Sequence, residues 1–76
     1  MDEAIFYKET QDAIYIRARG HITAALCTDL KNKVFSRIDS SEPLTAIHID
    51  LSECDYMDST FMGLIVGFRK RLHAFP

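Results

Sequence analysis

TAIHIDLSECDYMDSTFMGLIVGFRKRL, residues 45–72, predicts a buried strand, a short acidic loop and a helix, in that order. In the strand, Ile47 and Ile49 alternate with polar or small side chains, which is the period of two that a strand requires. The loop occupies residues 52–57. It delivers Asp58 to the start of the helix, where a carboxylate can accept a hydrogen bond from an unpaired amide of the first turn.

The predicted helix is apolar on more than one side. Five side chains follow helical spacing: Phe61, Leu64, Ile65, Phe68 and Leu72. Met62 and Val66 widen this stripe beyond what a single core-facing side needs. Gly63 and Gly67 indicate that another backbone or helix approaches closely. The width leaves two interpretations open, burial in the core or a homodimer interface. The homodimer would use four residues: Phe61, Phe68, Leu72 and Phe75.

The first half of the chain predicts a hairpin followed by a helix. Residues 5–9 are predicted to form a first strand, and residues 13–22, which alternate between apolar and polar side chains, a second one. The short turn between them makes the pair antiparallel. Gly20 marks a bend or bulge near the end of the second strand. Thr23 is the predicted N-cap of an amphipathic helix over residues 24–38, and the helical spacing places Arg37 on the polar side of that helix.

The predicted fold class is α/β, a small mixed β-sheet with two helices on one face and the order β-β-α-β-α. A strand, helix and strand in succession imply a right-handed parallel crossover. The length of 76 residues corresponds to a single domain, residues 1–76.

Composition narrows the classes of function. The net charge of −2 is mixed along the chain, which argues against a nucleic-acid partner. The longest apolar run, residues 61–68, is far too short to span a membrane, and no signal peptide is evident. Cys27 and Cys54 are then most simply free thiols of a cytoplasmic protein.

Enzymatic and metal-binding functions find little support in the sequence. Asp50, Asp55 and Asp58 could offer oxygen ligands to a divalent cation, but no further ligand set accompanies them. The histidines and cysteines lack the spacing of a zinc site, and no glycine-rich phosphate loop is present. We therefore expect no metal, no cofactor and no catalytic activity. Taken alone, Ser59 and Thr60 are also ordinary residues for a first helical turn.

A resemblance to a known family favours a functional role for the first turn of this helix. The segments that carry it are Asp50-Leu51, Tyr56-Met57-Asp58, Ser59-Thr60 and Gly63. They resemble the hallmark of the STAS domain family, in particular of bacterial anti-sigma factor antagonists. That hallmark is a strand ending in Asp-Leu, an aromatic-Met/Ile-Asp loop end, and Ser-Ser/Thr-Gly-Leu-Gly opening a helix. Residues 20–23 also resemble the family's entry to its first helix, and the resemblance covers nearly the whole chain.

The resemblance implies an anti-sigma factor antagonist in bacterial transcription regulation. In such proteins the Ser after the Asp is phosphorylated by a serine/threonine kinase that is also the anti-sigma factor. By position this is Ser59, with Thr60 as the alternative. The unphosphorylated form binds the kinase and frees the sigma factor. The implied partner-binding surface is Thr23, Asp58, Ser59, Thr60, Phe61 and Met62.

The chain departs from the family pattern in three ways. Phe61 and Met62 stand where the family has Gly and Leu, and Thr23 stands where an acidic residue is usual. The family domain continues through a further strand and helices, which this chain is expected to lack. These departures keep a second function open, a non-switching STAS-type interaction or scaffold domain that acts as a homodimer.

Overall fold

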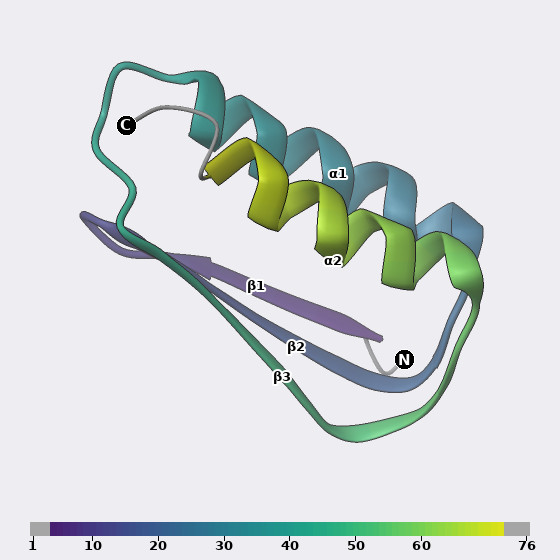
Figure 1. The fold of residues 1–76 in the computed structure, drawn as a ribbon. Coiled ribbons are helices and arrows are strands. Elements are labelled where there is room, and N and C mark those ends of the chain that lie inside the picture. The colour runs from purple at the N-terminus through teal and green to yellow at the C-terminus, as the bar shows by residue number, and fades with distance from the viewer. Residues whose placement is uncertain (1–3, 73–76) are drawn as a thin grey trace.

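The computed structural model describes residues 4–72 and contains five elements: β1 (Ile5–Glu9), β2 (Ala13–Ile22), α1 (Ala24–Asp39), β3 (Ala46–Met57) and α2 (Ser59–Leu72). The strands form one mixed sheet in the order β1-β2-β3. Both helices lie on the same face of that sheet (Figure 1). The predicted α/β fold and its order β-β-α-β-α are therefore confirmed.

The predicted hairpin is present. β1 pairs antiparallel with β2 along its whole length. The turn is closed at Thr10, whose amide donates to the carbonyl of Ala13 at 2.8 Å. The Thr10 Oγ1 in turn accepts a hydrogen bond from the Ala13 amide at 3.2 Å. The hairpin uses one edge of β2, and the other edge of β2 pairs with a later strand.

β3 pairs in parallel with β2, from Ala46 opposite Ala13 to Met57 opposite Ile22. The loop predicted for residues 52–57 is therefore wrong, because these residues continue the strand. Their side chains do not alternate regularly between polar and apolar, which is why the sequence pattern ends early. The physical reason lies in the pairing itself, which is irregular over this second half of β3.

Two register shifts interrupt the pairing of β2 with β3, one between Arg17 and Arg19 and one between Gly20 and His21. Gly20 has a φ of 69°, a left-handed conformation that glycine adopts without steric cost. The bend or bulge predicted at this glycine is confirmed. Each shift breaks the period of two that identifies a strand in the sequence.

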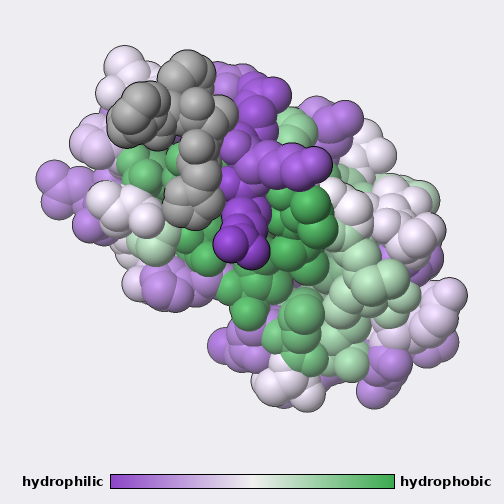
Figure 2. Space-filling model, in the orientation of Figure 1, coloured by the Kyte–Doolittle hydropathy of each residue, from purple (hydrophilic) through white to green (hydrophobic). Residues whose placement is uncertain are grey.

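The core lies between the sheet and the two helices. β2, α1 and α2 supply its buried residues: Ile14, Ile16, Ala18, Ile22, Cys27, Leu30, Val34, Phe61 and Phe68. Alternate side chains of β2 point toward the helices, as the pattern of that strand predicts. Hydrophobic residues also gather on the outer surface of the molecule, on the side that carries α2 and β3 (Figure 2).

The homodimer interface predicted on α2 is corrected by this core. Phe61 and Phe68 are buried within one chain, so they are not available to a second copy. They lie two turns apart and both face the sheet and α1, where the core needs large side chains. Leu72 is half-buried, and Phe75 lies outside the described residues. The exposed apolar residues of α2 are instead Met62 and Val66.

The two helices pack side by side with their N-termini at the same end of the molecule (Figure 1). At the opposite end, Arg71 Nη2 contacts both carboxylate oxygens of Asp39, at 2.6 and 2.7 Å. The rings of Phe35 and Phe68 meet edge to face with their centroids 5.5 Å apart. Over residues 4–72, neither helix combines the length and apolar character that crossing a membrane would require.

Arg37 is a polar residue that the helical pattern places on the solvent side, and this placement is wrong. Its side chain is only 7% exposed, and its Nε forms an ion pair with Glu9 at 3.1 Å. Its Nη2 donates to the carbonyls of Pro43, at 2.7 Å, and Gln11, at 3.1 Å. Its Nη1 donates to the carbonyl of Glu42 at 3.0 Å. One guanidinium therefore ties the hairpin turn to the connection between α1 and β3.

We predict that Arg37→Ala lowers the free energy of unfolding by about 2–4 kcal/mol, because several carbonyls and Glu9 lose their donor together. Urea denaturation followed by circular dichroism measures this change. Arg17→Ala is the matched control, since Arg17 pairs with Asp50 at 3.9 Å in an exposed position. That control should cost less than about 1 kcal/mol. Equal losses in the two variants would contradict the role assigned to Arg37.

Candidate functional site

The candidate site lies at the carboxyl ends of β2 and β3, where both helices begin. Ile22 and Met57 are opposite each other at the ends of these parallel strands. The residues that follow them, Thr23 and Asp58, each precede a helix. The structure therefore brings Thr23 and the start of α2 to one end of the molecule, as their joint assignment to a partner-binding surface requires (Figure 1).

Asp58 caps α2. Its Oδ1 accepts a hydrogen bond from the amide of Phe61 at 3.1 Å, which confirms the predicted N-cap. Its carbonyl accepts the first bond of the helix, from the Met62 amide at 3.3 Å. Ser59 and Thr60 follow in the first turn, and both residues are exposed. The positive end of the helix dipole thus lies beside two accessible hydroxyls.

The first turn of α1 is arranged differently. Thr23 occupies the N-cap position with an extended backbone, but its side chain makes no capping hydrogen bond. Its carbonyl accepts a bond from the Cys27 amide at 3.2 Å. Thr23 is exposed, so its hydroxyl is accessible at the same end of the molecule as Ser59.

Phe61 does not belong to the exposed surface, and its assignment to the partner-binding residues is corrected. Its side chain is 0% exposed and packs in the core between the sheet and the helices. Met62, the next residue, is 52% exposed and remains part of the surface. A large apolar side chain at position 61 therefore anchors the first turn of α2 to the rest of the domain.

A groove runs between α1 and α2 from this end of the molecule. Small and apolar residues line most of it: Ala24, Cys27, Thr28, Lys31, Phe35, Thr60, Gly63, Leu64 and Gly67. A Cβ atom at Gly63 would meet nothing within 4 Å, and one at Gly67 would meet the Phe35 ring at 3.9 Å. The helix approach predicted from the two glycines is therefore present at Gly67, where Phe35 of α1 lies in ordinary contact, whereas the space beside Gly63 is open.

Cys27, which lines the groove, has a thiol whose pKa depends on the nearby cap residue Asp58. Burial, and secondarily the negative charge of Asp58, raise the pKa of the Cys27 thiol. The thiol is therefore neutral at physiological pH and acts as a small core residue rather than as a nucleophile. This agrees with its inclusion in the hydrophobic core.

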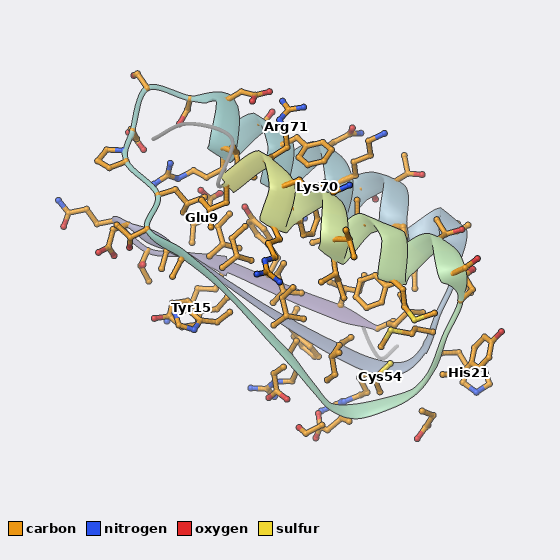
Figure 3. All side chains as sticks on the ribbon, viewed as in Figure 1. Glu9, Tyr15, His21, Cys54, Lys70 and Arg71 are labelled. Carbon is orange, nitrogen blue, oxygen red and sulfur yellow. The ribbon has the colours of Figure 1, made fainter. Side chains whose placement is uncertain are left out.

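An aromatic pair next to the site was missed by the sequence reasoning. The rings of His21 and Tyr56 meet at an angle of 61° with their centroids 5.9 Å apart. Tyr56 is 60% exposed, and His21 projects from the sheet at the end where α2 begins (Figure 3). The two residues are cross-strand partners. The sequence could have revealed this pair only if β3 had been extended to Met57.

The three aspartates considered as metal ligands do not converge. Among residues 4–72, no group of three or more His, Cys, Asp or Glu side chains is arranged to hold a metal ion. Asp50 lies on the open face of the sheet, where its Oδ1 accepts a hydrogen bond from the Ser52 amide at 2.9 Å. Hydrogen bonds from Ser52 hold the pKa of the Asp50 carboxyl below its usual range. Asp58 is occupied as the cap of α2.

The fold and this site together define a small α/β domain that presents an accessible, hydroxyl-bearing helix N-terminus beside the ends of two parallel strands. The chain belongs to the STAS domain family, because the family model described as "Mlab, STAS domain" matches residues 5–74. The family membership that the resemblance predicted is thus confirmed.

Solved structures support the same fold. The anti-sigma factor antagonist SpoIIAA in its unphosphorylated form matches with a TM-score of 0.86 at 24% sequence identity. The Bacillus cell fate determinant SpoIIAA in the phosphorylated form matches with a TM-score of 0.85 at the same identity. Each match covers 93% of this chain, and the chain spans 64% of the length of each of those structures. A search of curated proteins found no match.

We predict that Phe61→Ala lowers the free energy of unfolding by about 3–5 kcal/mol, because it empties a fully buried site. Met62→Ala is the neighbouring control and should change stability by less than about 1 kcal/mol. Thermal and urea unfolding of the two variants measure the difference. A Phe61→Ala protein as stable as the control would restore this residue to the exposed surface.

Proposed function

We propose that this domain is an anti-sigma factor antagonist, a bacterial cytoplasmic binding module and not an enzyme. Its partner in this proposal is an anti-sigma factor with serine/threonine kinase activity. The observation that carries the proposal is the exposed Ser59 directly after the capping Asp58, at the start of α2. The fold is similar to that of SpoIIAA, which has been solved in unphosphorylated and phosphorylated forms.

The proposed docking surface is the end of the molecule where both helices begin. It comprises Thr23, Asp58, Ser59, Thr60 and Met62, without the buried Phe61. The kinase would approach Ser59 as its phosphoacceptor, with Thr60 as the alternative acceptor one residue later. Both residues are exposed in the folded domain.

Phosphorylation would act on the interface and leave the fold intact. A phosphate on Ser59 adds about −1.5 to −2 charges at a helix N-terminus, which favours anions. The hydrogen bond from the Phe61 amide to Asp58 and the burial of Phe61 do not involve the Ser59 hydroxyl. Asp58 and the exposed Asp55 already make this end negative, so the added charge and bulk would repel a partner that fits the bare hydroxyl.

A second candidate function is a non-switching STAS-type scaffold that acts as a homodimer. Met62 and Val66 favour it, because they leave apolar surface on α2 that is 52% and 53% exposed. In this function Ser59 would be an ordinary residue of the first turn. The two candidates differ in whether a phosphate on Ser59 changes partner binding.

We predict that incubation with MgATP and an anti-sigma factor kinase from the same genome adds one phosphate, which tandem mass spectrometry locates on Ser59. Ser59→Ala should abolish this phosphorylation, and Thr60→Ala should retain it. Ser59→Asp should weaken binding of the kinase by about tenfold or more through like-charge repulsion. Its far-UV circular dichroism spectrum should match that of the unmodified protein.

Three results would count against this proposal. A phosphate on Thr60 would move the switch by one residue and refute the assignment to Ser59. A loss of helical signal in Ser59→Asp would show that charge unfolds the first turn. An absence of phosphorylation together with unchanged kinase binding by Ser59→Asp would support the scaffold.

A further inference from the structure

The groove between α1 and α2 begins beside the first turns of both helices. Its lining runs from Ala24 to Phe35 on α1 and from Thr60 to Gly67 on α2, and its volume is about 440 Å³. Arg71 lies at the opposite end, where its guanidinium carbon is 4.8 Å from the centroid of the Phe35 ring. Thr60 therefore belongs both to the groove and to the proposed docking surface.

Aromatic rings fill the space between the helices at one end only. Phe35 and Phe68 meet edge to face toward the C-termini of the helices, with their centroids 5.5 Å apart. Nearer the N-termini, Gly63 contributes no side chain, and a Cβ atom there would meet nothing within 4 Å. Glycine is less favourable than alanine inside a helix, so packing within the chain does not account for this residue. The space that it leaves is available to a partner.

The floor of the groove is apolar. Cys27 is 3% exposed and belongs to the hydrophobic core. Leu64 packs against that core but is only half-buried, since the groove lies over it. Interfaces commonly place an apolar side chain of one protein in a hollow between two helices of the other. The groove is therefore suited to an apolar side chain of a partner.

Lys31 supplies a positive charge to the lining of the groove. It is exposed on α1, and within residues 4–72 it forms no ion pair. The neighbouring docking surface has the opposite sign, because Asp58 lies there. A partner that covers both areas thus meets a carboxylate at the helix start and an ammonium group in the groove. Charge complementarity then requires a carboxylate of the partner beside Lys31.

We propose that the anti-sigma factor inserts an apolar side chain into this groove and places a carboxylate beside Lys31. The inference rests on the proposed function and names a contact that the same partner makes next to its phosphoacceptor. Ser59 directly precedes Thr60, which lines the groove, so a kinase surface that reaches Ser59 also lies at the groove. The groove contact holds the bare form of the domain, and a phosphate on Ser59 weakens binding at its border.

The experiment measures the dissociation constant for the purified anti-sigma factor kinase from the same genome, by isothermal titration calorimetry. Gly63→Leu fills the groove and should raise this constant about tenfold or more. Lys31→Glu replaces attraction by repulsion and should raise it about threefold or more.

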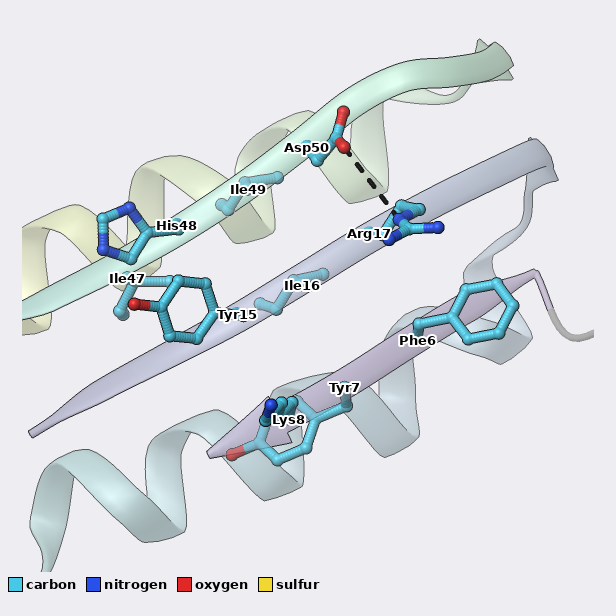
Figure 4. Close-up of a pocket in the computed structure, with 10 residues that line it drawn as sticks. All are labelled: Phe6, Tyr7, Lys8, Tyr15, Ile16, Arg17, Ile47, His48, Ile49 and Asp50. Atoms are coloured by element: carbon cyan, nitrogen blue, oxygen red, sulfur yellow. Dashed lines mark ion pairs between the residues drawn. The ribbon is translucent and has the colours of Figure 1, made fainter. Parts of the chain in front are cut away.

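Two matched controls place the same changes elsewhere. Asn32→Leu adds a leucine to α1 on the side away from the groove, where Asn32 lies beside Ser36 and Arg37. Lys8→Glu reverses an exposed charge on the face of the sheet that the helices leave open (Figure 4). Both controls should leave the dissociation constant unchanged.

Circular dichroism of each variant separates a lost contact from a lost fold. Gly63→Ala is a milder second variant, because its methyl group meets nothing within 4 Å, and it should weaken binding less than Gly63→Leu does. If Ser59→Asp weakens kinase binding but folded Gly63→Leu or Lys31→Glu does not, the groove inference is overturned and the proposed function stands. A kinase that does not bind the unmodified chain at all would overturn both.

Discussion

The first turn of α2 is held from two sides, and the rest of the site depends on this arrangement. On the N-terminal side, Asp58 Oδ1 accepts a hydrogen bond from the Phe61 amide at 3.1 Å and caps the helix. On the side that faces the sheet, the Phe61 side chain is fully buried among residues of the sheet and α1. A cap contributes about 1 kcal/mol and a buried Phe several times more, so packing is the larger of the two terms. Ser59 and Thr60 lie between these anchors and point to solvent as a consequence.

This arrangement separates the stability of the helix start from the chemistry of its hydroxyls. Neither the hydrogen bond of the cap nor the burial of the Phe61 ring involves the Ser59 hydroxyl. The same end of the molecule also carries the start of α1, with an accessible Thr23, and the exposed Tyr56 beside it. In the proposed function, a partner that docks there meets a surface whose charge changes on phosphorylation while the fold stays the same.

Much of the fold follows from the sequence because short-range patterns specify it. The hairpin, α1, the first half of β3 and the cap at Asp58 all show the expected periodicity or capping residue. The second half of β3 does not, because the register shifts near Gly20 interrupt the alternation. Arg37 was placed in solvent because helical periodicity treats every charge as outward. Its partners, Glu9 and the carbonyl of Pro43, come from connections that only the tertiary fold brings together.

At the site, the sequence located the exposed hydroxyls but could not decide which apolar residues of α2 are buried. The stripe containing Phe61, Met62 and Val66 is too wide for one face. Only the position of the sheet shows that Phe61 faces inward while Met62 and Val66 face outward.

The most direct test of the fixed helix start is amide hydrogen exchange at Phe61 and Met62, measured by NMR in the unmodified protein and in protein carrying phosphoserine at position 59. If the cap and the buried ring hold the turn independently of Ser59, both amides keep the same protection in the two forms. Loss of protection at these amides on phosphorylation would show that the modification acts by melting the start of α2, and would contradict the account.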